Sequence, residues 1–118
     1  MAKSAAIVIS WGTPVRGREG KALEVFMESL GWWGKQATDG RCEEPIALFS
    51  EDGSNGMLII RGMSDALREL EESDEGRIIQ ARAGHIVEDL KTHWYLADDE
   101  IAAETQRFVQ AGTELGFM

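Results

Sequence analysis

The sequence predicts an α+β protein built on one sheet, and three observations lead to this prediction. The chain has 118 residues, which is the length of a single domain. Short β-branched, apolar runs alternate with longer segments whose apolar residues recur every three or four positions, as strands and helices do. Gly, Pro, Asp and Asn gather between these segments, where turns are expected.

The first two elements are a strand over residues 5–11 and a helix over residues 18–38. The strand is apolar on both faces, which is typical of a central strand. The helix has one apolar stripe, the pattern of a helix that packs on a sheet. Gly31 and Gly34 lie inside it, and each costs about 1 kcal/mol relative to alanine. We therefore expect this helix to break near these glycines.

A hairpin and an interrupted helix are expected next. Residues 46–50 and 57–61 are apolar runs separated by a turn cluster of Glu, Asp, Gly, Ser and Asn, which predicts two antiparallel strands. A helical pattern then covers residues 64–84. Ser73, followed by two acidic residues, can cap a second helical piece, so this helix should be broken or kinked there.

The last strand and the last helix complete the pattern. Residues 85–96 alternate between a mostly apolar and a mostly polar face, which predicts a strand at the sheet edge. An amphipathic helix follows from Asp98. The first six elements have the order βαββαβ of the ferredoxin-like fold. We expect one domain over residues 1–118, with a core of about 4–97 and a C-terminal helix of about 98–118.

This layout leaves one face of the sheet without helices. Two helices can cover only one face of a four-stranded sheet, and the other face also carries apolar residues. A second subunit would cover it, giving a homodimer. The C-terminal helix is the competing cover, because it could shield the same face within one chain.

Composition excludes several classes of function. Twelve basic and twenty-one acidic residues give a net charge of −9, which argues against binding nucleic acids or anionic membranes. The one cysteine, Cys42, cannot form an intrachain disulfide and fits a reducing compartment. No signal peptide and no apolar stretch of roughly 18 residues is seen, so we expect a cytoplasmic protein.

No metal site is expected from the sequence. His85 and His93 lie on one face of the predicted strand 85–96. Eight residues at ~3.3 Å each separate them by roughly 26 Å, too far to share an ion. No close grouping of His, Cys and Glu compensates for this distance.

One stretch of the chain resembles a known superfamily. Residues 58–67, LIIRGMSDAL, are similar to the segment after the third strand in dimeric α/β-barrel proteins, and so is the run from Ser73 to the last strand. This superfamily includes the antibiotic-biosynthesis monooxygenases and the stress-responsive barrel proteins. The resemblance covers about residues 4–97. It implies a homodimer whose sheets face each other, with a small-molecule pocket between sheet and helices in each subunit.

The resemblance also limits the chemistry. Members include cofactor-independent oxygenases, haem degraders and isomerases. Haem degraders use an Asn on the first strand and a Trp and a His on the second helix. This sequence has Ser10 and Trp11 where the Asn would be, and no His between Ser64 and Gly84. Haem degradation is therefore disfavoured, and no cofactor is expected.

The tryptophans are the candidate walls of a pocket. Trp32 and Trp33 are adjacent and flanked by glycines, so they could enclose an aromatic ligand. Alternatively, one packs in the core and the other covers a helix end. Trp11 ends the first strand, and Trp94 follows His93 on the last strand, so that these two side chains point to opposite faces of the sheet. Either tryptophan could also line the pocket.

Two polar residues are candidates for chemistry. His93 has a reference pKa near neutrality and could act as a proton acceptor. Otherwise it is an exposed histidine on an edge strand. Arg61 ends an apolar strand and could hold an anionic group of a substrate, or pair with a nearby acid. The acidic run at residues 69–75 is interpreted as a solvated helix face.

Together these observations predict a small-molecule-binding dimeric α/β-barrel protein. If the protein is an enzyme, the resemblance implies a cofactor-independent monooxygenase or isomerase acting on an aromatic or polyketide-like substrate. Such a substrate can supply its own electrons in a pocket that excludes water. The alternative is a non-catalytic interaction or regulatory module that uses the sheet face or the C-terminal helix. The sequence does not decide between a catalyst and a binding protein.

Overall fold

Four antiparallel strands form one sheet in the order β2-β3-β1-β4. A computed structural model describes residues 3–118. The strands are β1 (Ser4–Trp11), β2 (Ile46–Phe49), β3 (Gly56–Met63) and β4 (Lys91–Leu96). The two strands that are apolar on both faces, β1 and β3, lie in the centre, and β4 lies at an edge. This is the ferredoxin-like arrangement that the sequence predicts.

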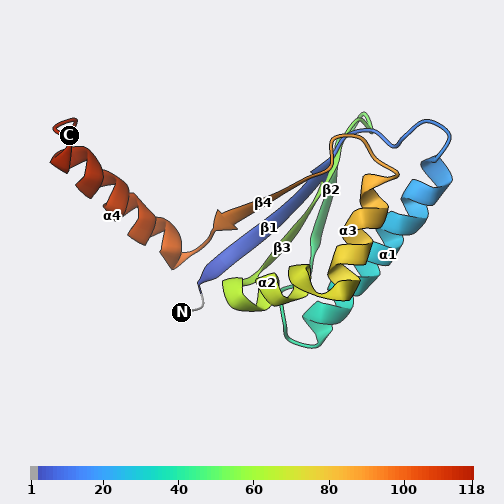
Figure 1. Ribbon diagram of the computed structural model, residues 1–118, viewed down its shortest axis with the longest axis horizontal. Coiled ribbons are helices and arrows are strands. Elements are labelled where there is room, and N and C mark those ends of the chain that lie inside the picture. The colour runs from blue at the N-terminus through green and yellow to red at the C-terminus, as the bar shows by residue number, and fades with distance from the viewer. Residues whose placement is uncertain (1–2) are drawn as a thin grey trace.

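Three helices cover one face of the sheet (Figure 1). They are α1 (Glu19–Thr38), α2 (Ser64–Glu72) and α3 (Asp74–Gly84), and the C-terminal helix is α4 (Asp99–Glu114). The predicted interruption of the 64–84 helix is confirmed. At the junction, the Ser73 hydroxyl donates to the Leu70 carbonyl at 2.6 Å and accepts from the Gly76 amide at 3.1 Å. Ser73 thus ends α2 and caps α3.

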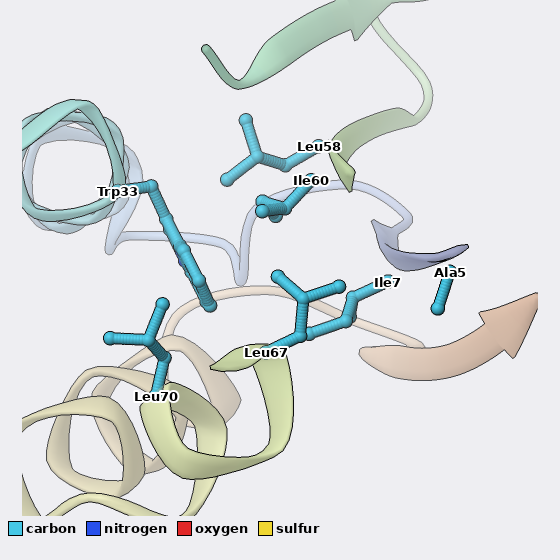
Figure 2. Close-up of a cluster of buried hydrophobic side chains, with 7 residues drawn as sticks. All are labelled: Ala5, Ile7, Trp33, Leu58, Ile60, Leu67 and Leu70. Atoms are coloured by element: carbon cyan, nitrogen blue, oxygen red, sulfur yellow. The ribbon is translucent and has the colours of Figure 1, made fainter. Parts of the chain in front are cut away.

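The core lies between the sheet and these three helices (Figure 2). Ile7 and Ile60 are paired across β1 and β3 and are both fully buried. Leu67 and Leu70 of α2 close over them, and Trp33 reaches in from α1. Each such side chain contributes roughly 1.5–3 kcal/mol by leaving water. This packing holds α2 against the centre of the sheet.

Two expectations about local structure are wrong. Helix α1 runs unbroken from residue 19 to residue 38, through Gly31 and Gly34. Trp33, only 4% exposed, anchors this part of α1 in the core, and its burial offsets the cost of the glycines. The last strand begins at Lys91 rather than at residue 85. Residues 85–90 form a connection from α3, with a single bridge between Val87 and Pro14.

Within residues 3–118, no helix lies on the opposite face of the sheet (Figure 1). Strand register places Val8, Ile59 and Ile46 side by side there, and Tyr95 lies on the same face next to Ala6. Ile46 is 47% exposed and Tyr95 is 52% exposed. We call this surface the open face. Its main apolar members are Val8, Ile46, Leu48, Met57, Ile59 and Tyr95.

Helix α4 does not shield the open face within the chain. It projects from the end of β4 away from the sheet and from the other helices (Figure 1), and none of its residues is buried. The radius of gyration is accordingly 16.9 Å, against roughly 13.5 Å for a compact chain of this length. Asp98 sets the direction of α4 with a φ of 53°, and its carboxylate accepts from Arg61 at 2.6 Å.

Candidate functional site: an apolar cavity behind the sheet

An apolar cavity of ≈ 180 Å³ lies between the helix-covered face of the sheet and helices α1 and α3. An engineered protein cavity of about 150 Å³ binds benzene, so this one has room for one aromatic ring or a small bicyclic ring system. Its lining residues are Ile9, Trp11, Pro14, Ala22, Leu23, Val25, Phe26, Ser29, Trp32, Trp33, Phe49, Leu58, Glu71, Gly76, Ile79, Gln80, Ala83, Ile86, Val87 and Leu90.

Three aromatic rings from three elements form one end of the cavity. Phe26 and Phe49 have ring centroids 5.0 Å apart, and Trp11 lies 5.9 Å from Phe26 and 6.3 Å from Phe49. These are favourable tilted and edge-on distances. Gly56 makes the cluster sterically feasible, because a Cβ there would lie 2.9 Å from both the Trp11 and Phe49 rings.

The neighbouring tryptophans Trp32 and Trp33 line the cavity together. Their rings meet edge-on with centroids 4.7 Å apart. Trp33 is buried and belongs to the core as well as to the cavity wall. Trp32 is half-buried, and its indole N–H donates to Glu75 Oε2 at 3.2 Å. Trp33 therefore packs in the core, as one alternative expects, while both rings lie at the cavity wall; their role in binding a ligand stays a prediction.

Among the residues that the structure describes, three with polar side chains other than the indoles line the cavity: Ser29, Glu71 and Gln80. The Ser29 hydroxyl donates to the Val25 carbonyl at 2.9 Å, and the Gln80 amide donates to the Thr92 hydroxyl at 2.8 Å. Glu71 Oε1 accepts the indole N–H of Trp94 at 3.3 Å. The cavity is thus an apolar space with one carboxylate in its wall.

The structure brings together some of the residues predicted for the site and separates others. Trp11, Trp32 and Trp33 meet at the cavity. Trp94 lies outside the lining and contacts it through Glu71.

Arg61 and His93 do not line the cavity, since register places both on the open face. Arg61 is ion-paired with Asp98, and the exposed His93 ring lies edge-on to Tyr95 with centroids 6.4 Å apart. His85, which the sequence places on the same strand as His93, instead ends α3.

Several lining residues escaped the sequence interpretation, and Glu71 is the most informative. It belongs to the acidic run expected to face solvent. Glu71 follows the buried Leu67 by four positions, so both lie on the same face of α2. That spacing was the available signal. Phe26 and Phe49 carried no signal beyond being apolar, because only the fold brings α1 and β2 together.

A second hollow lies at the other end of the sheet, near Arg61, Cys42 and Asp98. It is more open and more polar, and its arginine is already paired with Asp98. Burial raises the pKa of the Cys42 thiol, with Glu44 adding to the effect. A thiol with a raised pKa is a poor nucleophile, so the hollow carries no evident chemistry.

Residues 3–118 contain neither a metal-binding cluster nor a membrane-spanning helix. No group of three His, Cys, Asp or Glu side chains is arranged to hold a metal ion. Over the same residues, no helix has both the length and the apolar character required to cross a membrane.

Comparison with known proteins shows the fold class. No protein-family model and no curated protein sequence matches the chain. Among solved structures, a protein of unknown function from Bacteroides thetaiotaomicron superposes with a TM-score of 0.66 at 12% identity, covering 80% of this chain and 98% of that one. SnoaB, a cofactor-independent oxygenase from Streptomyces nogalater, gives 0.61 at 15% identity, covering 83% and 96%.

A proposed antibiotic biosynthesis monooxygenase from Deinococcus radiodurans gives a TM-score of 0.63 at 11% identity, with 80% of this chain and 93% of that one covered. The chain therefore has the ferredoxin-like fold of these antibiotic-biosynthesis-monooxygenase-like proteins, as the resemblance of residues 58–67 predicts. At these identities the likeness establishes fold, and activity has to be argued from the cavity itself.

Proposed function

We propose that the protein binds a small hydrophobic or aromatic molecule in the cavity between the sheet and helices α1 and α3. The supporting observation is the partly enclosed apolar space of ≈ 180 Å³ with five aromatic side chains in its wall. Apolar concavities with a few placed polar groups are the usual form of small-molecule sites. The five aromatic residues are Trp11, Phe26, Trp32, Trp33 and Phe49.

The chemistry that we propose for this site is cofactor-independent oxidation or isomerisation of an aromatic or polyketide-like substrate. The fold shared with SnoaB, described as a cofactor-independent oxygenase, supports this proposal. An electron-rich phenolic substrate can itself reduce dioxygen, so the protein has to bind it, orient it and keep water away. Apolar side chains supply most of the wall, which suits that exclusion.

The roles of three residues stay predictions. His93 is the predicted proton acceptor and Arg61 the predicted anion holder, and both lie on the open face. Trp94 is a predicted wall residue, and it contacts the cavity lining through Glu71. If His93 is the proton acceptor, His93→Ala abolishes turnover of a substrate without weakening its binding. Unchanged turnover in that variant would remove His93 from the mechanism.

Filling the cavity tests ligand binding directly. Ala83 lines the cavity, whereas Ala81 on the same helix is exposed and does not. We expect Ala83→Leu to abolish binding of naphthalene in calorimetry and Ala81→Leu to leave it intact. Equal binding by both variants, or by neither, contradicts the proposed site.

A homodimer formed through the open face is part of the proposal. Two apolar open faces would cover each other in a symmetric dimer, because each presents the same patch to its partner. Leu48 lies on the open face at 49% exposed, and Ile78 lies on helix α3 at 55% exposed. We expect Leu48→Glu to produce monomers in light scattering and Ile78→Glu to leave dimers. A monomeric wild-type chain would refute the assembly.

A second candidate function is the non-catalytic interaction module, and helix α4 is the observation that favours it. Ile101, Phe108 and Leu115 are 56%, 70% and 70% exposed. An isolated helix of this length is marginal in water, so a partner surface would stabilise it. This function predicts that Phe108→Ser abolishes the biological effect of the protein, whereas Ala83→Leu does not. The cavity-based function predicts the reverse.

We also propose a cellular location for the protein. A reducing compartment such as the cytoplasm suits the half-buried Cys42, which has no cysteine partner.

A further inference from the structure

Glu71 is the one charged side chain among the residues that line the cavity. No lysine, arginine or histidine shares the wall with it. A charge at an apolar, partly enclosed site acts through a lower effective dielectric than water, so its sign strongly affects which ligands can enter. A ligand that enters the cavity therefore has to be compatible with a negative charge in its wall.

The position of Glu71 is built into the fold. Leu67 and Leu70 are buried at the centre of the core and hold α2 on the sheet. Glu71 follows directly in the last turn of α2, and its Oε1 accepts the Trp94 indole N–H at 3.3 Å. Trp94 is held in turn by the Arg68 guanidinium, 4.1 Å above its ring centroid. The carboxylate is thereby oriented by two elements, α2 and β4.

Glu71 also keeps free capacity to accept a hydrogen bond. None of the ion pairs formed within residues 3–118 involves it. The Trp94 N–H is its one hydrogen-bond donor in that part of the chain, and it contacts Oε1. Oε2 accepts no hydrogen bond from these residues, so the carboxylate keeps one oxygen free of intramolecular donors. The neighbouring Ser29 and Gln80 already direct a donor to Val25 and Thr92 respectively.

We propose that Glu71 determines the specificity of the cavity: it selects a one- or two-ring aromatic molecule that carries an O–H or N–H donor, and it excludes aromatic carboxylates. This inference rests on the proposed function, since it names the class of ligand for the same cavity. A hydrogen bond to an ionised acceptor is roughly twice as strong as a neutral one. A ligand carboxylate would instead place two like charges together in an apolar space.

Matched bicyclic probes test this selection. Naphthalene, 2-naphthol and 2-naphthoate share one ring system and differ only in the polar group. Their affinities for the full-length protein would be measured by calorimetry at neutral pH. We expect 2-naphthol to bind about tenfold or more tightly than 2-naphthoate, since only 2-naphthol can donate a hydrogen bond to the Glu71 carboxylate.

Two variants provide the comparison. Glu71→Gln removes the charge but keeps an oxygen that can accept from Trp94, so the fold should persist, which a thermal melt checks. Glu72→Gln is the control, because Glu72 is exposed and does not line the cavity. We expect Glu71→Gln to lower the 2-naphthol to 2-naphthoate ratio well below the wild-type value, although the apolar wall still disfavours the carboxylate, and Glu72→Gln to leave the wild-type ratio unchanged.

The outcomes separate the two proposals. If naphthalene and both derivatives bind the wild type equally, or if Glu71→Gln leaves the ratio as it was, the role of Glu71 is refuted while the cavity stands. If none of the three probes binds, the proposed binding function fails, and the specificity proposal fails with it. Tighter binding of 2-naphthoate by the wild type would reverse the inferred sign of selection.

Discussion

Gly56 offers a sharp test of how the aromatic end of the cavity is packed. A Cβ at this position of β3 would lie 2.9 Å from the rings of both Trp11 and Phe49, whereas ordinary contacts begin near 3.4 Å. In Gly56→Ala both rings must therefore move by about half an ångström. Overpacking of this kind costs about 1–3 kcal/mol. Phe49 is 63% exposed and can move outward, which favours the lower part of that range.

Gly31→Ala is the matched control for this substitution. A Cβ at Gly31 in α1 meets nothing within 4 Å, and alanine is favoured over glycine in a helix by about 1 kcal/mol. Urea denaturation should therefore show Gly56→Ala less stable than the wild type and Gly31→Ala more stable. Calorimetry should also show weaker binding of naphthalene by Gly56→Ala alone. A Gly56→Ala variant as stable as the wild type would refute the packing described for Trp11 and Phe49.

Three further predictions follow from the packing and the hydrogen bonds. Leu67→Ala removes a fully buried side chain and should lower the free energy of unfolding in urea by about 2–5 kcal/mol; a loss below that range would mean that α2 is not held as described. Ser73→Ala removes the cap of α3, where the hydroxyl accepts from the Gly76 amide, and should cost about 1 kcal/mol in the same assay; no loss would show that the cap is dispensable. Hydrogen bonds from the backbone and side chain of Ser54 lower the pKa of Asp52 from 3.8 to about 2. The folded state therefore gains stability from the ionised Asp52 above its unfolded pKa and loses it as pH falls towards 2. A carboxyl titration followed by NMR should show that low midpoint, and a midpoint near 3.8 would contradict the hydrogen-bonded turn.

The sequence was sufficient for the order of elements because hydrophobic patterning reports burial. Strands β1 and β3 are apolar on both faces, and they lie in the centre of the sheet. The prediction of one strand over residues 85–96 was wrong because apolar patterning reports which residues are buried and does not report whether they form a strand. Ile86 is buried and Val87 bridges to Pro14, so the connection from α3 alternates like a strand without being one.

The break predicted in α1 failed because helix propensity is weaker than packing. Gly31 and Gly34 each disfavour the helix by about 1 kcal/mol, but Trp33 between them is buried in the core. A single buried indole compensates for both glycines. Local propensity could not reveal this, since the residues that surround Trp33 come from β1, β3 and α2.

The candidate site was only partly predictable. The tryptophans stood out by their rarity, and Trp11, Trp32 and Trp33 line the cavity. Which face of the sheet His93 and Arg61 occupy depends on strand register and on where the helices pack, and neither can be read from a single strand. Glu71 belongs to an acidic run whose other members are exposed, so it was interpreted as exposed too. Its spacing of four residues from the buried Leu67 indicated that it lies on the inner face of α2.

Native mass spectrometry of protein purified gently from its own cells tests the central proposal most directly. We expect a dimer in which each chain carries one extra small mass, retained in Ala81→Leu and lost in Ala83→Leu, because Ala83 lines the cavity and Ala81 does not. Fragmentation of that mass should yield an aromatic compound without a carboxylate. A bound mass that persists in Ala83→Leu, or a ligand-free chain that also fails to bind naphthalene, would contradict a binding site in this cavity.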